Sequence, residues 1–289
     1  MRALLGLVLA AVLGAAAGLW ITRPTVIDED EWTYTGDAVT GERIFHLAGC
    51  AGCHAAPSAT GEDRLVLAGG VRLESPFGTF VAPNISTDAQ AGVGDWTDAE
   101  LATAIMHGTA PGAAHLYPSF PYASYGLADP QDISDLIAYL RTLPPSDAVS
   151  QPHELPFPFN IRLGIGAWKL LNLPDGFSAV GDEDGRYIVE ALAHCAECHT
   201  PRDWTGGLDR SRWMAGAPNP SGRGTIPNIT SAALDWSAED IAYYLETGFT
   251  PDFDSAGGHM AEVVTSLGQV TAEDRAAISA YVKALAPLD

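Results

Sequence analysis

Sulfur is scarce in this sequence, which has four cysteines and four methionines among 289 residues. All four cysteines fall in two short stretches, GCAGCH at 49–54 and HCAECH at 194–199. Within each stretch the two cysteines are three positions apart, so a disulfide there would close a loop too small to brace a domain. A disulfide scaffold is therefore excluded, and the cysteines serve another chemistry.

Basic side chains are also few. Fifteen Lys and Arg stand against 36 Asp and Glu, and the formal net charge is −21. Such a surface argues against a nucleic-acid partner and against strong electrostatic attachment to anionic lipid. The sequence also lacks G-x-S-x-G, H-E-x-x-H and phosphate-loop motifs. These absences favour a carrier over an enzyme.

The N-terminus carries one long apolar run, residues 3–22, without a charged residue. As a helix it spans about 30 Å, the thickness of a hydrocarbon core. Arg2 precedes the run and the segment IDEDE at 27–31 follows it, which predicts an exported body. Its length and Trp20 favour a retained membrane anchor over residues 1–24, in the bacterial inner membrane with the body in the periplasm. The alternative is a cleaved signal peptide and a soluble periplasmic protein.

The repeated C-x-x-C-H pattern is typical of covalently attached haem c. On a helical turn, positions i and i+3 present two thiols to one edge of the macrocycle, and the next residue places its imidazole under the iron. Zinc and a thioredoxin-like redox pair are the rivals, but zinc sites do not place histidine directly after the second cysteine. We therefore predict two covalently bound haem c groups. The predicted attachment residues and axial ligands are Cys50, Cys53 and His54, and Cys195, Cys198 and His199.

The two halves of the sequence repeat one another. The matching segments are PNIS 83–86 and PNIT 227–230, the Asp-Trp segments 95–108 and 235–248, and the helical segments 132–143 and 274–285. Thr97 and Ser237 are predicted N-caps, and Gly108 and Gly248 are predicted helix stops. No persuasive alternating run indicates a strand, so the predicted fold is all-α: a tandem of two cytochrome c-like domains after an N-terminal transmembrane helix.

The predicted domains are residues 36–145 and 181–289, joined by a proline-rich segment at 146–180. Six apolar side chains of this segment are predicted to be buried: Phe157, Phe159, Ile161, Trp168, Leu170 and Leu171. That prediction makes the segment a strap packed against both domains, and the alternative is a solvated linker.

The order of the motifs SPFGTFVAPNIST, LYPSFPYASYG, HCAECHTPR and GGHMAEVV resembles the cytochrome c subunits of membrane-bound alcohol and gluconate dehydrogenases and their shorter di-haem relatives. The resemblance covers roughly residues 36–289, although those subunits usually carry three haem domains. It implies His/Met ligation, with Met260 as the sixth ligand of the second haem. It also implies that backbone carbonyls near Pro83 and Pro227 accept the Nδ1–H of the two axial histidines. Asn84 and Asn228 are expected to close turns, and contact with the haem propionates is the alternative.

The first predicted haem departs from the family pattern. Phe120 stands where the pattern Leu-Tyr-Pro-Ala-Met-Pro-Tyr has methionine, and a phenyl ring cannot bind iron. Either this iron is five-coordinate or another residue serves it. The candidates are His115, which lies in the same loop, Met106, His107 and Tyr122.

The resemblance implies an electron-transfer protein. Its donor would be a periplasmic or membrane-bound dehydrogenase, and its acceptor an oxidase, a quinone-linked complex or a soluble cytochrome. The alternative is a di-haem enzyme, peroxidase-like or sulfur-oxidising, that uses an open coordination position at the first haem. Only His115 is placed to act there as an acid or base.

Overall fold

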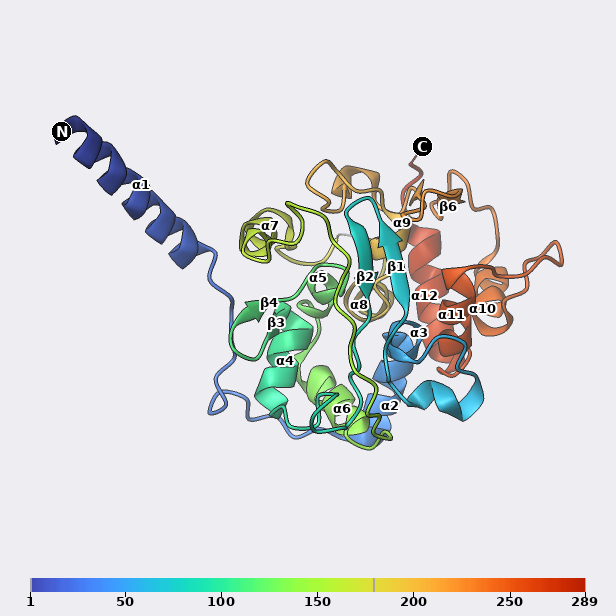
Figure 1. Cartoon of the computed structure of the whole chain (residues 1–289). Coiled ribbons are helices and arrows are strands. Elements are labelled where there is room, and N and C mark those ends of the chain that lie inside the picture. The colour runs from blue at the N-terminus through green and yellow to red at the C-terminus, as the bar shows by residue number, and fades with distance from the viewer. Residues whose placement is uncertain (1, 179, 289) are drawn as a thin grey trace.

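The computed structural model describes residues 2–178 and 180–288. Helix α1 (Arg2–Ile21) projects away from the body of the molecule (Figure 1). Its window Leu4–Ile21 has a mean hydropathy of 2.4, and none of that window is buried against the rest of the chain. By length and composition α1 can cross a membrane, and a signal sequence passes the same test.

The first half of the body consists of short helices joined by long loops. Its elements are α2 (Ala38–Leu47), α3 (Cys50–His54), the 3₁₀ turn η1 (Gly61–Leu65), β1 (Arg72–Ser75), β2 (Gly78–Val81), α4 (Asp98–His107), β3 (Thr109–Ala110), β4 (Ala114–His115), α5 (Tyr122–Tyr125) and α6 (Pro130–Leu140). Helix α7 (Gly164–Asn172) lies between the halves in the sequence.

The second half repeats this order. Its elements are α8 (Glu183–Tyr187), the π-helical turn η2 (Ile188–Leu192), α9 (Ala196–His199), the 3₁₀ turn η3 (Arg210–Arg212), β5 (Ala217–Pro218), β6 (Thr225–Ile226), α10 (Ala238–Thr247), α11 (His259–Leu267) and α12 (Ala272–Ala284). The fold is helix-rich, as predicted, but the absence of strands was wrong. The strands form three antiparallel pairs, β1–β2, β3–β4 and β5–β6. They are two to four residues long, too short to give an alternating pattern.

The predicted helix ends are confirmed. The side chains of Thr97 and Ser237 each accept a hydrogen bond from the backbone amide three residues on, and the side chains of Glu100 and Asp240 each accept one from the backbone amide of the cap residue. These bonds satisfy amides that helix geometry leaves without partners. Gly108 ends α4 in the left-handed region at φ 58°, which favours glycine.

In each half the first and last helices cross and pack closely against each other at a glycine. A Cβ added to Gly41 of α2 would lie 1.9 Å from the backbone oxygen of Asp135 on α6. In the second half, a Cβ on Gly185 of α8 would lie 2.5 Å from the oxygen of Ala277 on α12. Only glycine permits this approach of two backbones. Around these crossings one apolar core runs without interruption through both halves.

The segment at 146–180 follows the body along its first part. The backbone amide of Val81 donates to Nδ1 of His153, and β2 is extended by a bridge between Thr79 and Glu154. Its apolar side chains do not behave as predicted. Five of the six predicted to be buried are exposed: Phe157, Phe159, Ile161, Leu170 and Leu171.

Candidate haem-binding sites

Both C-x-x-C-H stretches fold into one helical turn. Helix α3 starts at Cys50 after Gly49, and α9 starts directly after Cys195, whose oxygen accepts the amide of His199 at 3.0 Å. Residues three apart on such a turn share a face. None of the four cysteines is paired in a disulfide within residues 2–178 and 180–288. Burial raises the pKa of Cys50 and of Cys195 to about 12, which is the opposite of a thioredoxin-like thiolate.

The two histidines have the same environment. Nδ1 of His54 lies 2.9 Å from the backbone oxygen of Pro83, and Nδ1 of His199 lies 2.8 Å from that of Pro227. These are the carbonyl contacts predicted from the sequence. Burial lowers the pKa of both imidazoles, more strongly than the carbonyl contacts raise it. A neutral ring that donates from Nδ1 presents the lone pair of Nε2, the donor that iron requires.

The loops after the histidines also repeat bond for bond. Gly69 donates its amide to the oxygen of His54 at 2.7 Å, and Gly216 donates to the oxygen of His199 at the same distance. Both glycines have positive φ, 74° and 81°. Each loop therefore folds back over its own histidine, and the two sites share the same backbone hydrogen bond and loop conformation.

Two asparagines complete the repeat. The Oδ1 of Asn84 accepts from the amide of Ser86 at 2.8 Å, and that of Asn228 accepts from the amide of Thr230 at 2.8 Å. Nδ2 of Asn228 then donates to the oxygen of Leu288 near the chain end. The asparagines close turns, as predicted, and their Nδ2 groups also hold a segment later in the chain.

The predicted sixth-ligand positions differ between the sites. Met260 lies in the first turn of α11, partly buried against the core. In the first half Phe120 takes a corresponding place before α5, and its ring centroid lies 5.7 Å from that of Tyr125. Met214, the other methionine of the second half, is fully buried.

His115 is buried beside the base of α1. Its Nε2 lies 3.0 Å from the backbone oxygen of Thr22, and its Nδ1 is buried with no hydrogen-bond partner among the described residues. The structure brings His115 to Thr22, and ligation by His115 stays a prediction. The backbone oxygen of His107 accepts from Nζ of Lys169, and Tyr122 is buried with its hydroxyl unpaired within residues 2–178 and 180–288.

The two C-x-x-C-H turns lie side by side. Nε2 of His194, the residue before Cys195, lies 3.2 Å from the oxygen of Ala48, two residues before Cys50. The rings of His194 and Tyr125 meet edge to face with centroids 5.7 Å apart. Sequence reasoning missed this contact, because a repeat predicts two similar sites and says nothing of their relative placement.

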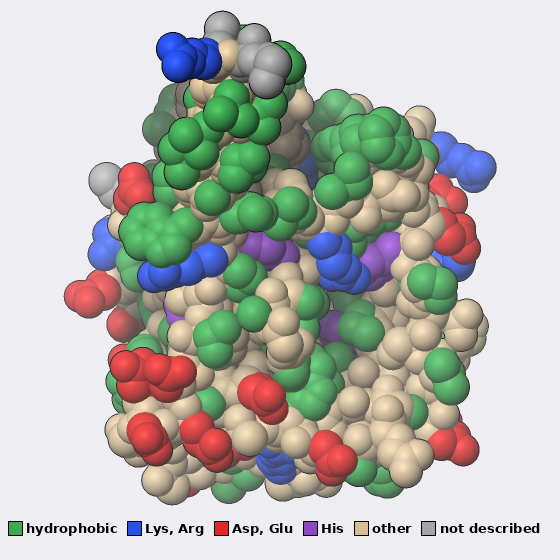
Figure 2. Space-filling model, turned by 60° about the vertical axis from the view of Figure 1, so that its left-hand side comes forward, with side chains coloured by type: hydrophobic (Ala, Val, Ile, Leu, Met, Phe, Trp, Pro, Cys, Tyr) green, Lys and Arg blue, Asp and Glu red, His purple; other side chains and the backbone are tan. Residues whose placement is uncertain are grey.

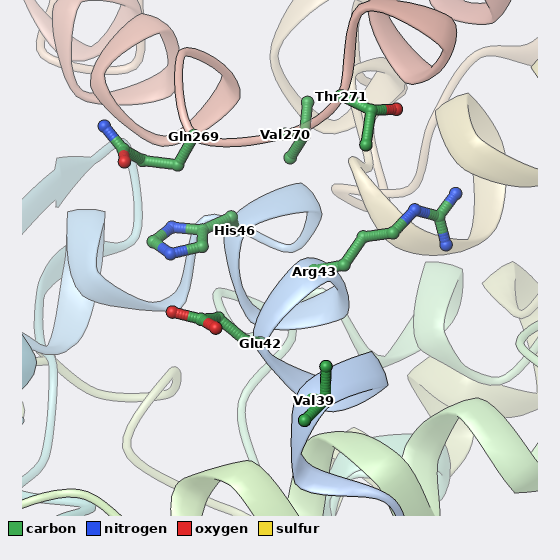
Figure 3. Close-up of a pocket in the computed structure, with 7 residues that line it drawn as sticks. All are labelled: Val39, Glu42, Arg43, His46, Gln269, Val270 and Thr271. Atoms are coloured by element: carbon green, nitrogen blue, oxygen red, sulfur yellow. The ribbon is translucent and has the colours of Figure 1, made fainter.

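A separate groove of about 270 Å³ lies where α2 faces the turn between α11 and α12 (Figure 3). His46, Glu42 and Arg43 line it from α2, and Gln269 lines it from the other half. Burial lowers the pKa of His46. No group of three metal-binding side chains occurs here or elsewhere in the described part of the chain.

Two cysteine-histidine turns, each with its imidazole held by a backbone carbonyl, define a c-type cytochrome. The comparisons agree: a family model described as cytochrome c matches residues 38–144. The diheme cytochrome c-type protein of Cereibacter sphaeroides is 58% identical over 284 residues, which cover 96% of each chain. The chain therefore belongs to the cytochrome c family, which implies covalently bound haem c.

Subunits of dehydrogenases are more distant relatives. The fructose dehydrogenase cytochrome subunit of Gluconobacter japonicus is 37% identical over 85% of this chain and 52% of its own length. The gluconate 2-dehydrogenase cytochrome c subunit of Pantoea cypripedii is 31% identical over 86% of this chain and 59% of its own. The chain thus spans little more than half of either subunit.

Proposed function

We propose that this chain is a di-haem c-type cytochrome that relays electrons from a dehydrogenase to the respiratory chain. One haem would be held in each half, 36–145 and 181–289, with the linker 146–180 between them. The observation that carries the proposal is the duplicated turn with its histidine–carbonyl hydrogen bond. The proposed ligands and attachment residues are Cys50, Cys53 and His54, and Cys195, Cys198, His199 and Met260.

The chain's own groups suit that role. The carbonyls of Pro83 and Pro227 orient the imidazoles and strengthen their Nε2 as donors. Haem supplies one-electron chemistry, and a thioether from Met260 would raise the potential of the second site. For the first site we propose a cover by Phe120. Ligation by His115 is the alternative, because its Nε2 contacts the oxygen of Thr22 while its Nδ1 has no partner among the described residues.

The partners are inferred from the relatives. Three of them are named as cytochrome subunits of fructose, gluconate and alcohol dehydrogenases, so a dehydrogenase is the proposed donor. The proposed acceptor is an oxidase, a quinone-linked complex or a soluble cytochrome. Helix α1 would anchor the chain in the inner membrane, with the haem-bearing body in the periplasm.

Mass spectrometry of the full chain, matured in a host that attaches haem c, tests the proposal. We expect the mass of the chain plus two haems. The double variant Cys50→Ala, Cys53→Ala should lose one of them, and Cys195→Ala, Cys198→Ala the other. A wild-type chain without covalent haem would overturn the assignment.

Carbon monoxide distinguishes the relay from an enzyme with an open iron. If Phe120 closes the first site, the spectrum of the reduced protein should not change when the gas is added. A shift of half the Soret absorbance in the wild type would instead show an accessible iron. Peroxide turnover by that protein would favour the enzyme.

A further inference from the structure

The segment at 157–177 carries a concentration of exposed apolar side chains. Eight large hydrophobic residues within these positions are at least 40% exposed: Phe157, Phe159, Ile161, Leu163, Leu170, Leu171, Leu173 and Phe177. Leu171 is 72% exposed and Phe157 is 79% exposed. Contiguous apolar patches are uncommon on soluble monomers and mark contact surfaces.

The local charge of this segment is opposite to that of the protein. Residues 155–174 contain no Asp or Glu, whereas the whole chain has 36 among its 289 residues. The two charged residues within 155–174 are Arg162 and Lys169. Of these two, Arg162 is exposed, whereas Lys169 reaches inward to the backbone. Exposed apolar side chains beside a cation and without acids are typical of surfaces that meet lipid.

Helix α7 is held firmly with its apolar face outward. Ile165 and Gly166 are buried on its inner side, and Lys169 reaches inward to the backbone oxygens of His107 and Gly108 at 2.6 and 2.8 Å. Leu163, just before the helix, and Leu170 and Leu171 within it lie on the opposite side, at the i, i+7 and i+8 positions of one stripe. The exposure therefore belongs to the folded state.

This apolar surface is continuous with the base of α1. A groove of about 240 Å³ is lined by Leu19 and Arg23 from one side and by Arg162 and Leu163 from the other. Figure 2 shows hydrophobic side chains gathered at the top of the molecule beside the projecting helix and basic side chains just below them. Most acidic side chains on this face lie in the lower half, and a few lie higher up at the two edges. This order matches a bilayer, in which the apolar side chains would meet the hydrocarbon interior and the basic side chains the polar headgroups.

We propose that α7 and its flanking loop, residues 157–173, lie in the interface of the phospholipid bilayer as a second membrane contact. The inference rests on the proposed anchoring by α1. It adds that the body lies against the membrane on its α7 side, at a fixed orientation. The favoured occupant is lipid rather than a protein subunit, because residues 157–173 adjoin the base of α1 and include no Asp or Glu.

Spin labelling of the full haem-loaded chain in phosphatidylcholine nanodiscs tests this contact. The native cysteines are consumed by haem, so Leu171→Cys carries a single label. Val39→Cys is the matched control, because Val39 is apolar, 82% exposed and on α2, at the other end of the body from α7 (Figure 1). Leu9→Cys, within α1, reports the anchor itself.

We expect the label at Leu171 to be relaxed more by oxygen than by a water-soluble nickel complex, as at Leu9, and the reverse at Val39. A label at Phe157 should agree with Leu171. If Leu171 matches Val39 while Leu9 stays in lipid, the α7 contact is overturned and the anchor stands. If Leu9 itself is aqueous, the anchoring fails. Shielding of Leu171 that requires an added dehydrogenase subunit would assign the patch to protein and overturn the inference.

Discussion

At the scale of single residues, one side chain distinguishes two otherwise repeated sites. His54 and His199 share the same carbonyl contact, and their loops share the same hydrogen bonds. Phe120 and Met260 break the symmetry, because only the thioether can bind iron. Two sites with one design and different ligands would have different potentials, which gives a relay its direction.

Met260→Leu should lower one of the two haem potentials and leave the other near its value. We expect a fall of about 100 mV, within the roughly 0.8 V range that axial ligands span. Potentiometric titration of the absorption spectrum measures it. Met214→Leu is the control, since Met214 is fully buried and the swap conserves volume. Equal potentials in both variants would show that Met260 is not a ligand.

Lys169 should titrate far below an ordinary lysine. Burial lowers its pKa from 10.5 to about 8. Since the folded state disfavours the protonated form, stability should rise as the pH increases from about 8 to 10.5. The chain has one other lysine, Lys283, so the ¹⁵N signals of the reduced protein can be assigned with Lys283→Arg. A midpoint above pH 10 for Lys169 would contradict the prediction.

At the scale of elements, the two halves share the sequence signals that begin their helices. Asp-Trp is followed by Thr97 in one half and Ser237 in the other, and both form capping boxes. The same signal recurs at Thr271, which begins α12. Three helices, α4 in the first half and α10 and α12 in the second, thus begin at short local sequence patterns and do not depend on packing alone.

Thr97→Ala should cost about 1 kcal/mol of unfolding free energy, because the amide of Glu100 loses its acceptor. Thr265→Ala is the control. Thr265 is exposed within α11 and bonds only to the oxygen of Ala261 in its own helix, so its loss should stay within about 0.5 kcal/mol. Urea unfolding followed by circular dichroism measures both. Equal losses of unfolding free energy in the two variants would show that the N-cap of Thr97 does not stabilise the protein.

Elements governed by local rules could be predicted from the sequence, and those governed by distant contacts could not. The helix ends follow from residue spacing, and the histidine–carbonyl pairs were implied by the resemblance to cytochrome c subunits. The short strand pairs were missed because two residues show no periodicity. The burial of Phe157 and Leu171 was predicted from apolarity alone, which does not say what surface a side chain will meet.

At the scale of the whole molecule, charged and aromatic contacts bind the halves together. Nε of Arg43 donates to Oδ2 of Asp274 at 2.9 Å, and Arg64 pairs with Glu262 at 2.6 Å. Burial opposes ionisation of Asp274, but the hydrogen bond and charge of Arg43 outweigh it and hold its pKa below the ordinary value. The joint between the halves is therefore sensitive to acid.

Arg43→Met should destabilise the protein by about 1 kcal/mol at pH 7, a modest figure because Arg43 is 40% exposed and water screens the pair. Because the pKa of Asp274 is lower in the folded state than in the unfolded state, the ion pair stabilises the fold above the unfolded carboxyl pKa of about 4. This stabilisation is lost as the pH falls through the folded pKa. The difference in unfolding free energy between the variant and the wild type should therefore become smaller from pH 7 to pH 3. Arg72→Met, which breaks an exposed pair with Glu154, should change stability less. A gap that widens in acid would contradict this reasoning.

The contact between His194 and Ala48 has a consequence for turnover. It ties the two attachment turns into one body. If each turn holds a haem, as proposed, a donor that releases two electrons could pass both to the same molecule during a single encounter. A carrier with one centre would have to dissociate and be replaced between the first transfer and the second.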